Sequence, residues 1–207
     1  ALRDALPDAV DPMFAAIYTD PNNDSSRIDD AVVFTRWNGA DKLLDGGTLT
    51  WQPQATIAVI GQIEVAEPNR QVSLSRDGTT GTIGIAFVTE AKTVRLAVSN
   101  DEGATWSLET ASLNPSGHLL SNPALALAGG VTHLAYFEAE TPCGTLDCGQ
   151  VVYRRRVGKA TFSDATSPAP AGADVALARP ISLAVDSAGA AGLTYFVGPT
   201  GAASGPV

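Results

Sequence analysis

Oxygen-bearing side chains near the start of the chain have the spacing of cation ligands. Asp20, Asn22 and Asp24 alternate along the sequence. Calcium-binding loops of the EF-hand type present oxygen ligands at alternate positions in this way. The glycine and the bidentate glutamate of such a loop are replaced here by serine and alanine, so a nearby carboxylate, Asp29 or Asp30, would have to complete the site. Two interpretations follow: a calcium site, or an acidic loop in solvent.

The two cysteines of the chain, Cys143 and Cys148, enclose the four residues Gly-Thr-Leu-Asp. A short interval containing glycine and aspartate predicts a disulfide that closes a hairpin tip in an oxidising compartment, with free thiols as the alternative. A zinc site is disfavoured because neither His118 nor His133 is close in sequence and there is no second cysteine pair.

The sequence gives little evidence for a catalytic nucleophile or for a phosphate-binding motif. Neither histidine has a nucleophile-elbow neighbour, and His133 lies within an alternating, strand-like run. No glycine-rich phosphate-binding pattern follows a strand and opens a helix. The segment 75–78, Ser-Arg-Asp-Gly, indicates an Asp-Gly hairpin turn. The catalytic residues, if the chain has any, stay unknown at this point.

Residues 99–106 read Ser-Asn-Asp-Glu-Gly-Ala-Thr-Trp. A carboxylate at position 101 can accept hydrogen bonds from backbone N–H groups further on, and a glycine at 103 can adopt the positive φ of a tight hairpin. Hydroxyl side chains on either side can tie the two flanking strands together, and the tryptophan can bury a large apolar face. These residues therefore predict a structural turn between two strands, with the tryptophan as a ligand platform being the alternative.

This octapeptide matches the Asp-box pattern, Ser/Thr-x-Asp-x-Gly-x-Thr-Trp/Phe, at Ser99, Asp101, Gly103, Thr105 and Trp106. It resembles the strand-joining turns of sialidase-like (BNR-repeat) β-propellers. The resemblance implies a propeller fold, in which such turns lie away from the substrate face. Sialidases of this fold also carry a Phe/Tyr-Arg-Ile-Pro segment, three carboxylate-binding arginines, a Tyr-Glu nucleophile pair and an acid Asp. Here the segment 26–29, Ser-Arg-Ile-Asp, keeps only Arg-Ile, and the resemblance transfers no catalytic residue.

Three segments repeat a hairpin of alternating small and apolar residues with an aromatic late in the second strand. The leucine-to-phenylalanine spacing is 13, 12 and 13 residues in the pairs Leu74 and Phe87, Leu125 and Phe137, and Leu183 and Phe196. Trp51, Trp106 and Phe162, each starting a further strand, are 55 and 56 residues apart. This interval suits four short strands with their turns.

We therefore predict an all-β fold, a β-propeller of four-stranded antiparallel blades with about three and a half blades in this chain. Residues 1–207 form a single partial domain with approximate blades at 13–61 (partial), 70–113, 121–165 and 179–207 (partial). Propellers typically close with 4–8 blades. The ring is either completed by a second polypeptide, from the same precursor or as a homo-oligomer, or closed by pairing of the two terminal half-blades. We favour the second polypeptide because half a propeller leaves long unpaired strand edges.

The composition restricts the partners. The 207 residues include 13 Lys plus Arg and 22 Asp plus Glu, a formal net charge of −9. This charge disfavours nucleic acid and anionic membrane surfaces as main partners. No apolar run approaches the ~20 residues of a membrane-spanning helix. The two cysteines, together with an abrupt start at Ala1 like that of a processed protein, predict a secreted or periplasmic protein.

The function predicted first is an extracellular Asp-box propeller that binds glycan or protein ligands through loops at its rim. One alternative is a sialidase-like glycoside hydrolase whose active site is shared with a missing second chain. The other is a non-catalytic assembly scaffold. Because one fold supports many functions, the sequence leaves open whether the protein is an enzyme.

Overall fold

The computed structural model describes residues 13–18, 30–36, 55–61, 72–89, 93–112, 118–139, 149–159, 161–163, 165–168, 174–175 and 180–198. Each regular element in these ranges is a strand, and every strand pair is antiparallel. Within this part of the chain, no helix has the length and apolar character needed to cross a membrane.

The strands form four successive sheets, named here in chain order, and one small ribbon. The first sheet contains β1 (Met13–Tyr18), β2 (Asp30–Arg36) and β3 (Ala55–Gly61). The second contains β4 (Val72–Arg76), β5 (Ile83–Val88), β6 (Val94–Ser99) and β7 (Ser107–Ser112). The third contains β8 (Leu119–Ala128), β9 (Val131–Ala139) and β10 (Gln150–Val157). The fourth contains β12 (Ser182–Val185) and β13 (Ala191–Thr194), and β11 (Asp174–Val175) pairs with β14 (Val197–Gly198).

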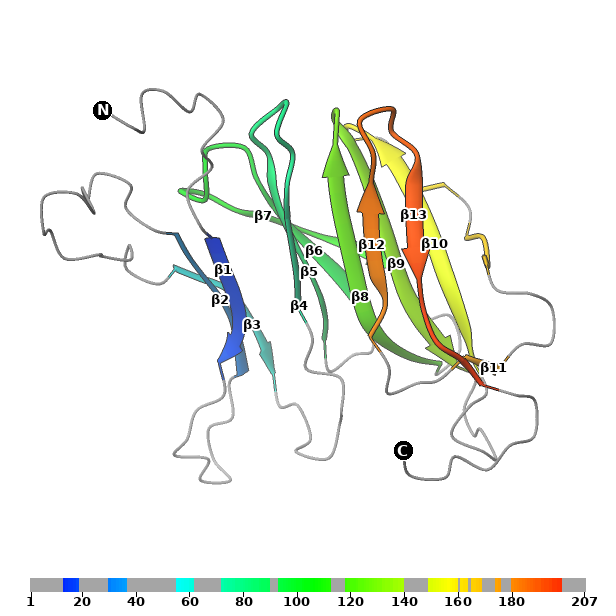
Figure 1. Cartoon of the computed structure of the whole chain (residues 1–207). Helices are drawn as coiled ribbons and strands as arrows, with labels where there is room; N and C mark the ends of the chain where they lie inside the picture. Colours follow the sequence, from blue (N-terminus) through cyan, green and yellow to red (C-terminus); the bar gives the residue numbers. More distant parts are fainter. Residues whose placement is uncertain are drawn as a thin grey trace, which may run out of the picture.

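The sheets stand side by side in chain order, face against face, from β1–β3 to β12–β13 (Figure 1). This is the arrangement of successive blades in a β-propeller, and the described part of the chain forms only part of a ring. The predicted all-β, partial-propeller fold is confirmed. In the second sheet the order β4-β5-β6-β7 is the four-stranded meander expected of a complete blade. The division of the whole chain into blades stays a prediction, since several of its boundaries lie outside the described residues.

The hydrophobic core is divided into three seams between neighbouring sheets. Strand residues alternate between two faces, so a sheet covered on both sides carries apolar residues at consecutive positions, as in Ile83–Val88. The seams join, in order, Val32, Phe34 and Ile57 to Ile83, Ile85 and Phe87; Ala86, Val94 and Leu96 to Leu125, Leu134 and Tyr136; and Ala124, Ala135 and Phe137 to Ile181, Leu183 and Leu193.

The structure corrects the alignment of the three repeated hairpins. Phe87 packs toward the preceding sheet, whereas Phe137 packs toward the following one. The counterparts of Phe87 are therefore Tyr136 and Tyr195, which also face the preceding sheet, and Phe137 corresponds to Phe196.

The different lengths of the hairpin turns explain why the leucine-to-phenylalanine spacing did not predict which way each phenylalanine faces. The turn between β4 and β5 has six residues, 77–82, whereas that between β8 and β9 has two, Gly129 and Gly130, both with positive φ. The turn between β12 and β13 has five residues, 186–190, so the same 13-residue spacing puts Phe196 on the opposite face from Phe87. A change of one residue in a strand exchanges its two faces, so equal spacing in sequence did not mean the same face.

Candidate functional site

The Asp-box residues form one hydrogen-bonded turn between β6 and β7. Thr105 donates from its backbone N–H to Asp101 Oδ1 at 2.8 Å and from its hydroxyl to Asp101 Oδ2 at 2.5 Å. The Ser99 hydroxyl donates to Asp101 Oδ1 at 2.8 Å and accepts from the Gly103 N–H at 2.8 Å. The indole N–H of Trp106 donates to the Gly103 carbonyl at 3.0 Å. Hydrogen bonds from Thr105 and then Ser99 lower the pKa of Asp101 to about 2.

The same turn packs against the first sheet. The Trp106 and Phe34 rings meet edge to face with their centroids 5.0 Å apart. Gly103 has φ +90°, and a Cβ there would lie 2.5 Å from Phe34 Cε1. Arg36 Nη1 also bonds Glu102 Oε2 at 2.7 Å. Because the Trp106 ring is used in this packing, the ligand-platform interpretation is disfavoured.

The β4–β5 turn of the second sheet is hydrogen-bonded to the third sheet through Asp77. The Asp77 carboxylate accepts from Thr79 N at 2.8 Å, Thr80 N at 3.3 Å and Gly130 N at 2.6 Å, the last across the seam. Burial of Asp77 acts to raise its pKa, but these hydrogen bonds together outweigh burial and lower the pKa. This pairing fixes the β4–β5 turn beside the β8–β9 turn.

A groove of about 510 Å³ opens between these two sheets at the end where the turns lie. Its size is within the usual range of small-ligand sites. Its apolar lining includes Val98 and Leu108 from the second sheet and Leu127 and Val131 from the third. Both sheets also contribute polar side chains to the lining.

On the second sheet the groove carries a chain of linked polar side chains. The Thr80 hydroxyl donates to Thr82 Oγ1 at 2.9 Å, and the Thr82 hydroxyl donates to Asn100 Oδ1 at 3.0 Å. This arrangement uses the amide oxygen of Asn100 as an acceptor, so the NH₂ group of this exposed residue can donate to a ligand. Ser107 is held by its hydroxyl to the Val98 carbonyl at 3.2 Å.

On the third sheet the groove carries two cationic side chains. Arg156 is buried and makes a bidentate pair with Glu109 of the second sheet, with Nη1 2.6 Å from Oε2 and Nη2 bonded to Oε1. Its guanidinium also lies 4.7 Å from the Phe162 ring centroid. Lys159 is exposed and forms no ion pair with a described residue, so its ammonium can meet a ligand.

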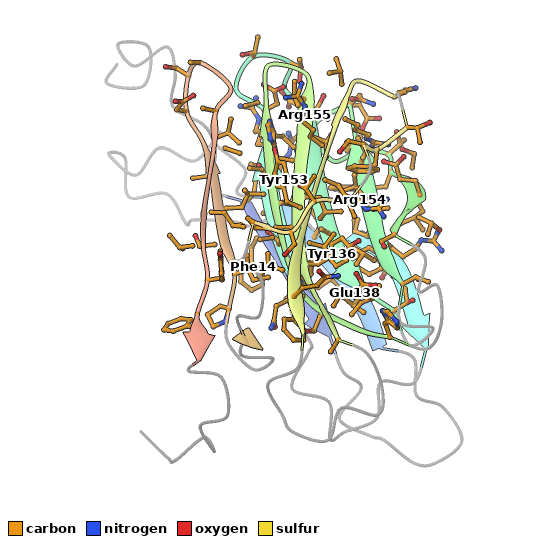
Figure 2. The ribbon with its side chains drawn as sticks, turned by 90° about the vertical axis from the view of Figure 1, so that its right-hand side faces the viewer. Phe14, Tyr136, Glu138, Tyr153, Arg154 and Arg155 are labelled. Carbon is orange, nitrogen blue, oxygen red and sulfur yellow. The ribbon has the colours of Figure 1, made fainter. Side chains whose placement is uncertain are left out.

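A separate polar cluster lies at the opposite end of the same seam. His118 Nδ1 is 2.9 Å from Glu138 Oε1, and Tyr136 donates from its hydroxyl to Ser112 Oγ at 2.9 Å. Burial raises the pKa of Tyr136, and the bond to Ser112 partly offsets that effect. Figure 2 shows Tyr136 and Glu138 toward one end of β9 and β10, with Arg155 toward the other. This end lies away from the Asp box.

Several residues that the sequence singled out are not described by the structure. Asp20, Asn22, Asp24, Cys143 and Cys148 all lie outside the described residues, so the calcium site and the disulfide stay predictions. Within the described ranges no group of three or more His, Cys, Asp or Glu side chains is arranged to hold a metal ion.

The surroundings of His133 are those of a buried structural residue rather than of a catalytic one. It is buried in β9, with Nδ1 2.7 Å from the Tyr153 hydroxyl, and burial followed by the nearby Arg155 lowers its pKa. The groove residues Asn100 and Lys159 were missed by sequence reasoning. The only feature of the sequence that could have indicated them is their position next to a predicted strand end. The sequence could not show that these two strand ends lie on opposite sides of one groove.

No protein-family model matches the chain, and comparison with curated proteins finds no match. Among solved structures, the GH93 alpha-L-arabinofuranosidase of Fusarium graminearum with arabinobiose is 14% identical, with a TM-score of 0.44. A mutant alpha-L-arabinofuranosidase of the same fungus, with an iminosugar inhibitor, is 16% identical with a TM-score of 0.45. Each match covers 82% of this chain and 57% of the other. A mutant of AofleA from Arthrobotrys oligospora is 11% identical, with a TM-score of 0.44, covering 92% of this chain and 61% of that one. These likenesses assign no activity, ligand or residue to this chain.

Proposed function

We propose that this chain is part of a β-propeller that binds a glycan in the groove between its second and third sheets. The supporting observation is the hydroxyl-amide chain from Thr80 to Asn100, opposite the exposed ammonium of Lys159. Sugar hydroxyls donate and accept hydrogen bonds, so a site with both kinds of group suits them. The aliphatic side chains of the lining can cover the C–H face of a sugar ring and exclude water.

The two sides of the groove have different roles in this proposal. The second sheet offers the Asn100 amide and the threonine hydroxyls, held in place by their mutual hydrogen bonds. The bidentate pair between Arg156 and Glu109 joins the two sheets and fixes this wall of the groove before a ligand arrives. Lys159 is the flexible partner that can donate to a ring or glycosidic oxygen. A preorganised wall lowers the entropy cost of binding.

The test begins with a glycan array on the purified chain and continues with titration calorimetry on each glycan that binds. Replacing Asn100 or Lys159 with alanine removes one donor each, and we expect Kd to rise about tenfold, or ~1.4 kcal/mol, in each case. Thr161→Ala is the matched control, since this exposed threonine is outside the groove. Binding that is absent from the array, or that both groove variants retain at full strength, would contradict the proposal.

The wider family assignment is also a proposal. The hydrogen bonds of the turn at residues 99–106 support placing the chain with the Asp-box, sialidase-like propellers. Secretion and the Cys143–Cys148 disulfide belong to the same proposal. Intact mass after alkylation without reductant tests the disulfide: no added alkyl group supports it, and two added groups count against it.

Glycoside hydrolysis is the second candidate function, favoured by the His118 and Glu138 pair at the end opposite the Asp box. The resemblance puts the substrate face at that end. Glycosidases ordinarily use two carboxyl groups, so Glu138 would need a second carboxylate from a residue beyond the described ones or from a partner chain. A panel of fluorogenic glycosides tests this function. Turnover by the wild type that is lost in Glu138→Gln would support it. A preparation that binds glycans but turns none of them over would count against it. A chain that neither binds glycans nor turns them over would fit the scaffold alternative.

A further inference from the structure

One of the two histidines of the chain is buried on the side of the third sheet that faces the fourth. His133 is 2% exposed and shares a face of β9 with Ala135 and Phe137, because alternate residues of a strand point the same way. That face packs against β12 and β13, whose Leu183 and Leu193 lie in the same seam (Figure 1). The imidazole is therefore covered by the fourth sheet.

One ring nitrogen of His133 has a hydrogen-bond partner and the other has none among the described residues. Nδ1 lies 2.7 Å from the Tyr153 hydroxyl, whereas the buried Nε2 is unpartnered. Burial raises the pKa of Tyr153, so this hydroxyl stays uncharged near neutral pH. A protonated imidazole has two N–H donors. Protonation would therefore leave a charged N–H at Nε2 without an acceptor, which is costlier in a buried site than a neutral ring.

The strands beside β9 add a positive charge next to the imidazole. Arg155 is directly opposite His133 in the pairing of β9 with β10, so the two side chains share a face. Tyr153 and Arg155 follow one another along β10 (Figure 2). On the other side, β8 places the uncharged Ala126 opposite His133. Burial first, and then Arg155, lower the pKa of His133.

The described part of the fourth sheet offers no compensating carboxylate. Of its residues in the seam, Tyr195 is the one with a titratable side chain, and its hydroxyl donates to the Pro168 carbonyl. The carboxylate of Asp186, in the β12–β13 turn, accepts from Ala188 N and Ala190 N of that same turn. A proton on His133 would therefore gain no ion pair with a described residue.

We propose that His133 makes this seam sensitive to acid, so that protonation releases β12 and β13 from the third sheet. Once the seam opens, water can solvate both N–H groups, so opening takes up a proton and acid favours it. The stability that the neutral imidazole provides is complete above its ordinary pKa of 6.5 and is lost as the pH falls through the lowered pKa of the folded chain. Between these two values the opening equilibrium constant should rise by up to about tenfold per pH unit. The fourth sheet has two strands of four residues each, so it can open locally while larger sheets stay folded.

NMR titration of the imidazole signals from about pH 8 to about pH 4 tests the protonation step. Because the chain has two histidines, His118→Gln leaves one signal, which belongs to His133. We expect its midpoint below 6.5, and Arg155→Gln should raise that midpoint by removing a like charge. A midpoint at or above 6.5, or one that Arg155→Gln lowers, would overturn the proposal.

Hydrogen exchange over the same pH range, corrected for the intrinsic pH dependence of exchange, tests the opening step. In the wild type and in His118→Gln, the amides of β12 and β13 should lose protection before those of β5 and β6, by up to about tenfold per pH unit. His133→Asn should abolish this loss, since its amide can still bond Tyr153 and does not titrate in this range. A loss unchanged in His133→Asn, or protection lost in all sheets together, would overturn the proposal.

Arg155→Gln gives the same test without a change in the buried seam, because the Arg155 side chain is exposed. Raising the pKa of folded His133 brings it closer to that of the open state. The total loss of protection in β12 and β13 should therefore be smaller than in the wild type. A loss as large as that of the wild type, in a variant whose midpoint has risen, would show that His133 does not drive the opening.

Discussion

The carboxylate of Asp77, in the first turn of the second sheet, accepts a hydrogen bond from the backbone N–H of Gly130, in the first turn of the third, at 2.6 Å. Two serine hydroxyls of β4 continue this connection to β8. Leu125 N donates to Ser73 Oγ and Leu127 N donates to Ser75 Oγ, both at 2.9 Å. These bonds satisfy N–H groups on the open edge of β8, where no strand pairs in the described part of the chain. They hold the two walls of the groove at a fixed separation.

Asp77→Ala should lower the free energy of unfolding by about 1–3 kcal/mol, because the backbone N–H groups of Thr79, Thr80 and Gly130 lose a charged acceptor. Asp186→Ala is the control: Asp186 accepts from Ala188 N and Ala190 N in its own turn, and the residue is exposed on the last sheet. Urea denaturation of both variants measures the difference, which reports the contribution of the contact across the seam. Equal losses would show that the bond to Gly130 adds nothing.

Asp101 should contribute to acid unfolding. Its pKa is about 2 in the folded chain against an ordinary value of 3.8, because Thr105 and Ser99 hydrogen-bond the carboxylate. A lowered pKa gives stability that is present above pH 3.8 and lost as the pH falls toward 2. Asp101→Asn should therefore be less stable at neutral pH and show a flatter decline between about pH 4 and pH 2. Parallel stability curves for wild type and variant would refute this assignment.

Gly103→Ala should destabilise the chain by about 3 kcal/mol, because alanine is strained at φ +90° and its Cβ would meet Phe34. Two controls separate these causes. Gly129→Ala has φ +57° and open space, so it should lose only about 1–2 kcal/mol. Gly78→Ala has neither positive φ nor a neighbour within 4 Å, and it should be close to neutral. Thermal unfolding checks all three, and a Gly103 variant no worse than the Gly129 variant would exclude the clash.

Tyr136→Phe should cost about 1 kcal/mol, since it removes a buried hydrogen bond to Ser112 and keeps the ring in the seam. Tyr195→Phe is the matched change at an exposed hydroxyl, whose bond to the Pro168 carbonyl is 3.1 Å long, and it should change stability by less than about 0.5 kcal/mol. Guanidinium titrations measure both. A neutral Tyr136 variant would mean that the Ser112 bond makes no net contribution.

Calcium should raise the melting temperature if Asp20, Asn22 and Asp24 form the predicted site, because a ligand that binds only the folded state stabilises it. Differential scanning calorimetry with calcium and with a chelator measures the effect. Asp24→Asn should reduce the rise, since calcium affinity depends on ligand charge. An unchanged melting temperature in calcium and in chelator would reject the site.

The sequence by itself determined the strand content and the turn chemistry. Alternating apolar residues with glycine at the turns predicted antiparallel hairpins, and the spacing of Trp51, Trp106 and Phe162 predicted a repeating four-strand unit. The bonds within residues 99–106 are local, between groups at most four positions apart, so the residue types were enough to predict that turn.

Tertiary structure decided which residues meet across the sheets. The facing of Phe87 and Phe137 depends on the turn length and strand pairing of each hairpin, and the alignment by spacing was wrong there. The groove brings together Asn100 and Lys159 from sheets that are separate in sequence, and the contact between Asp77 and Gly130 spans 53 positions. Such long-range contacts depend on the twist and stacking of whole sheets, which no local pattern encodes.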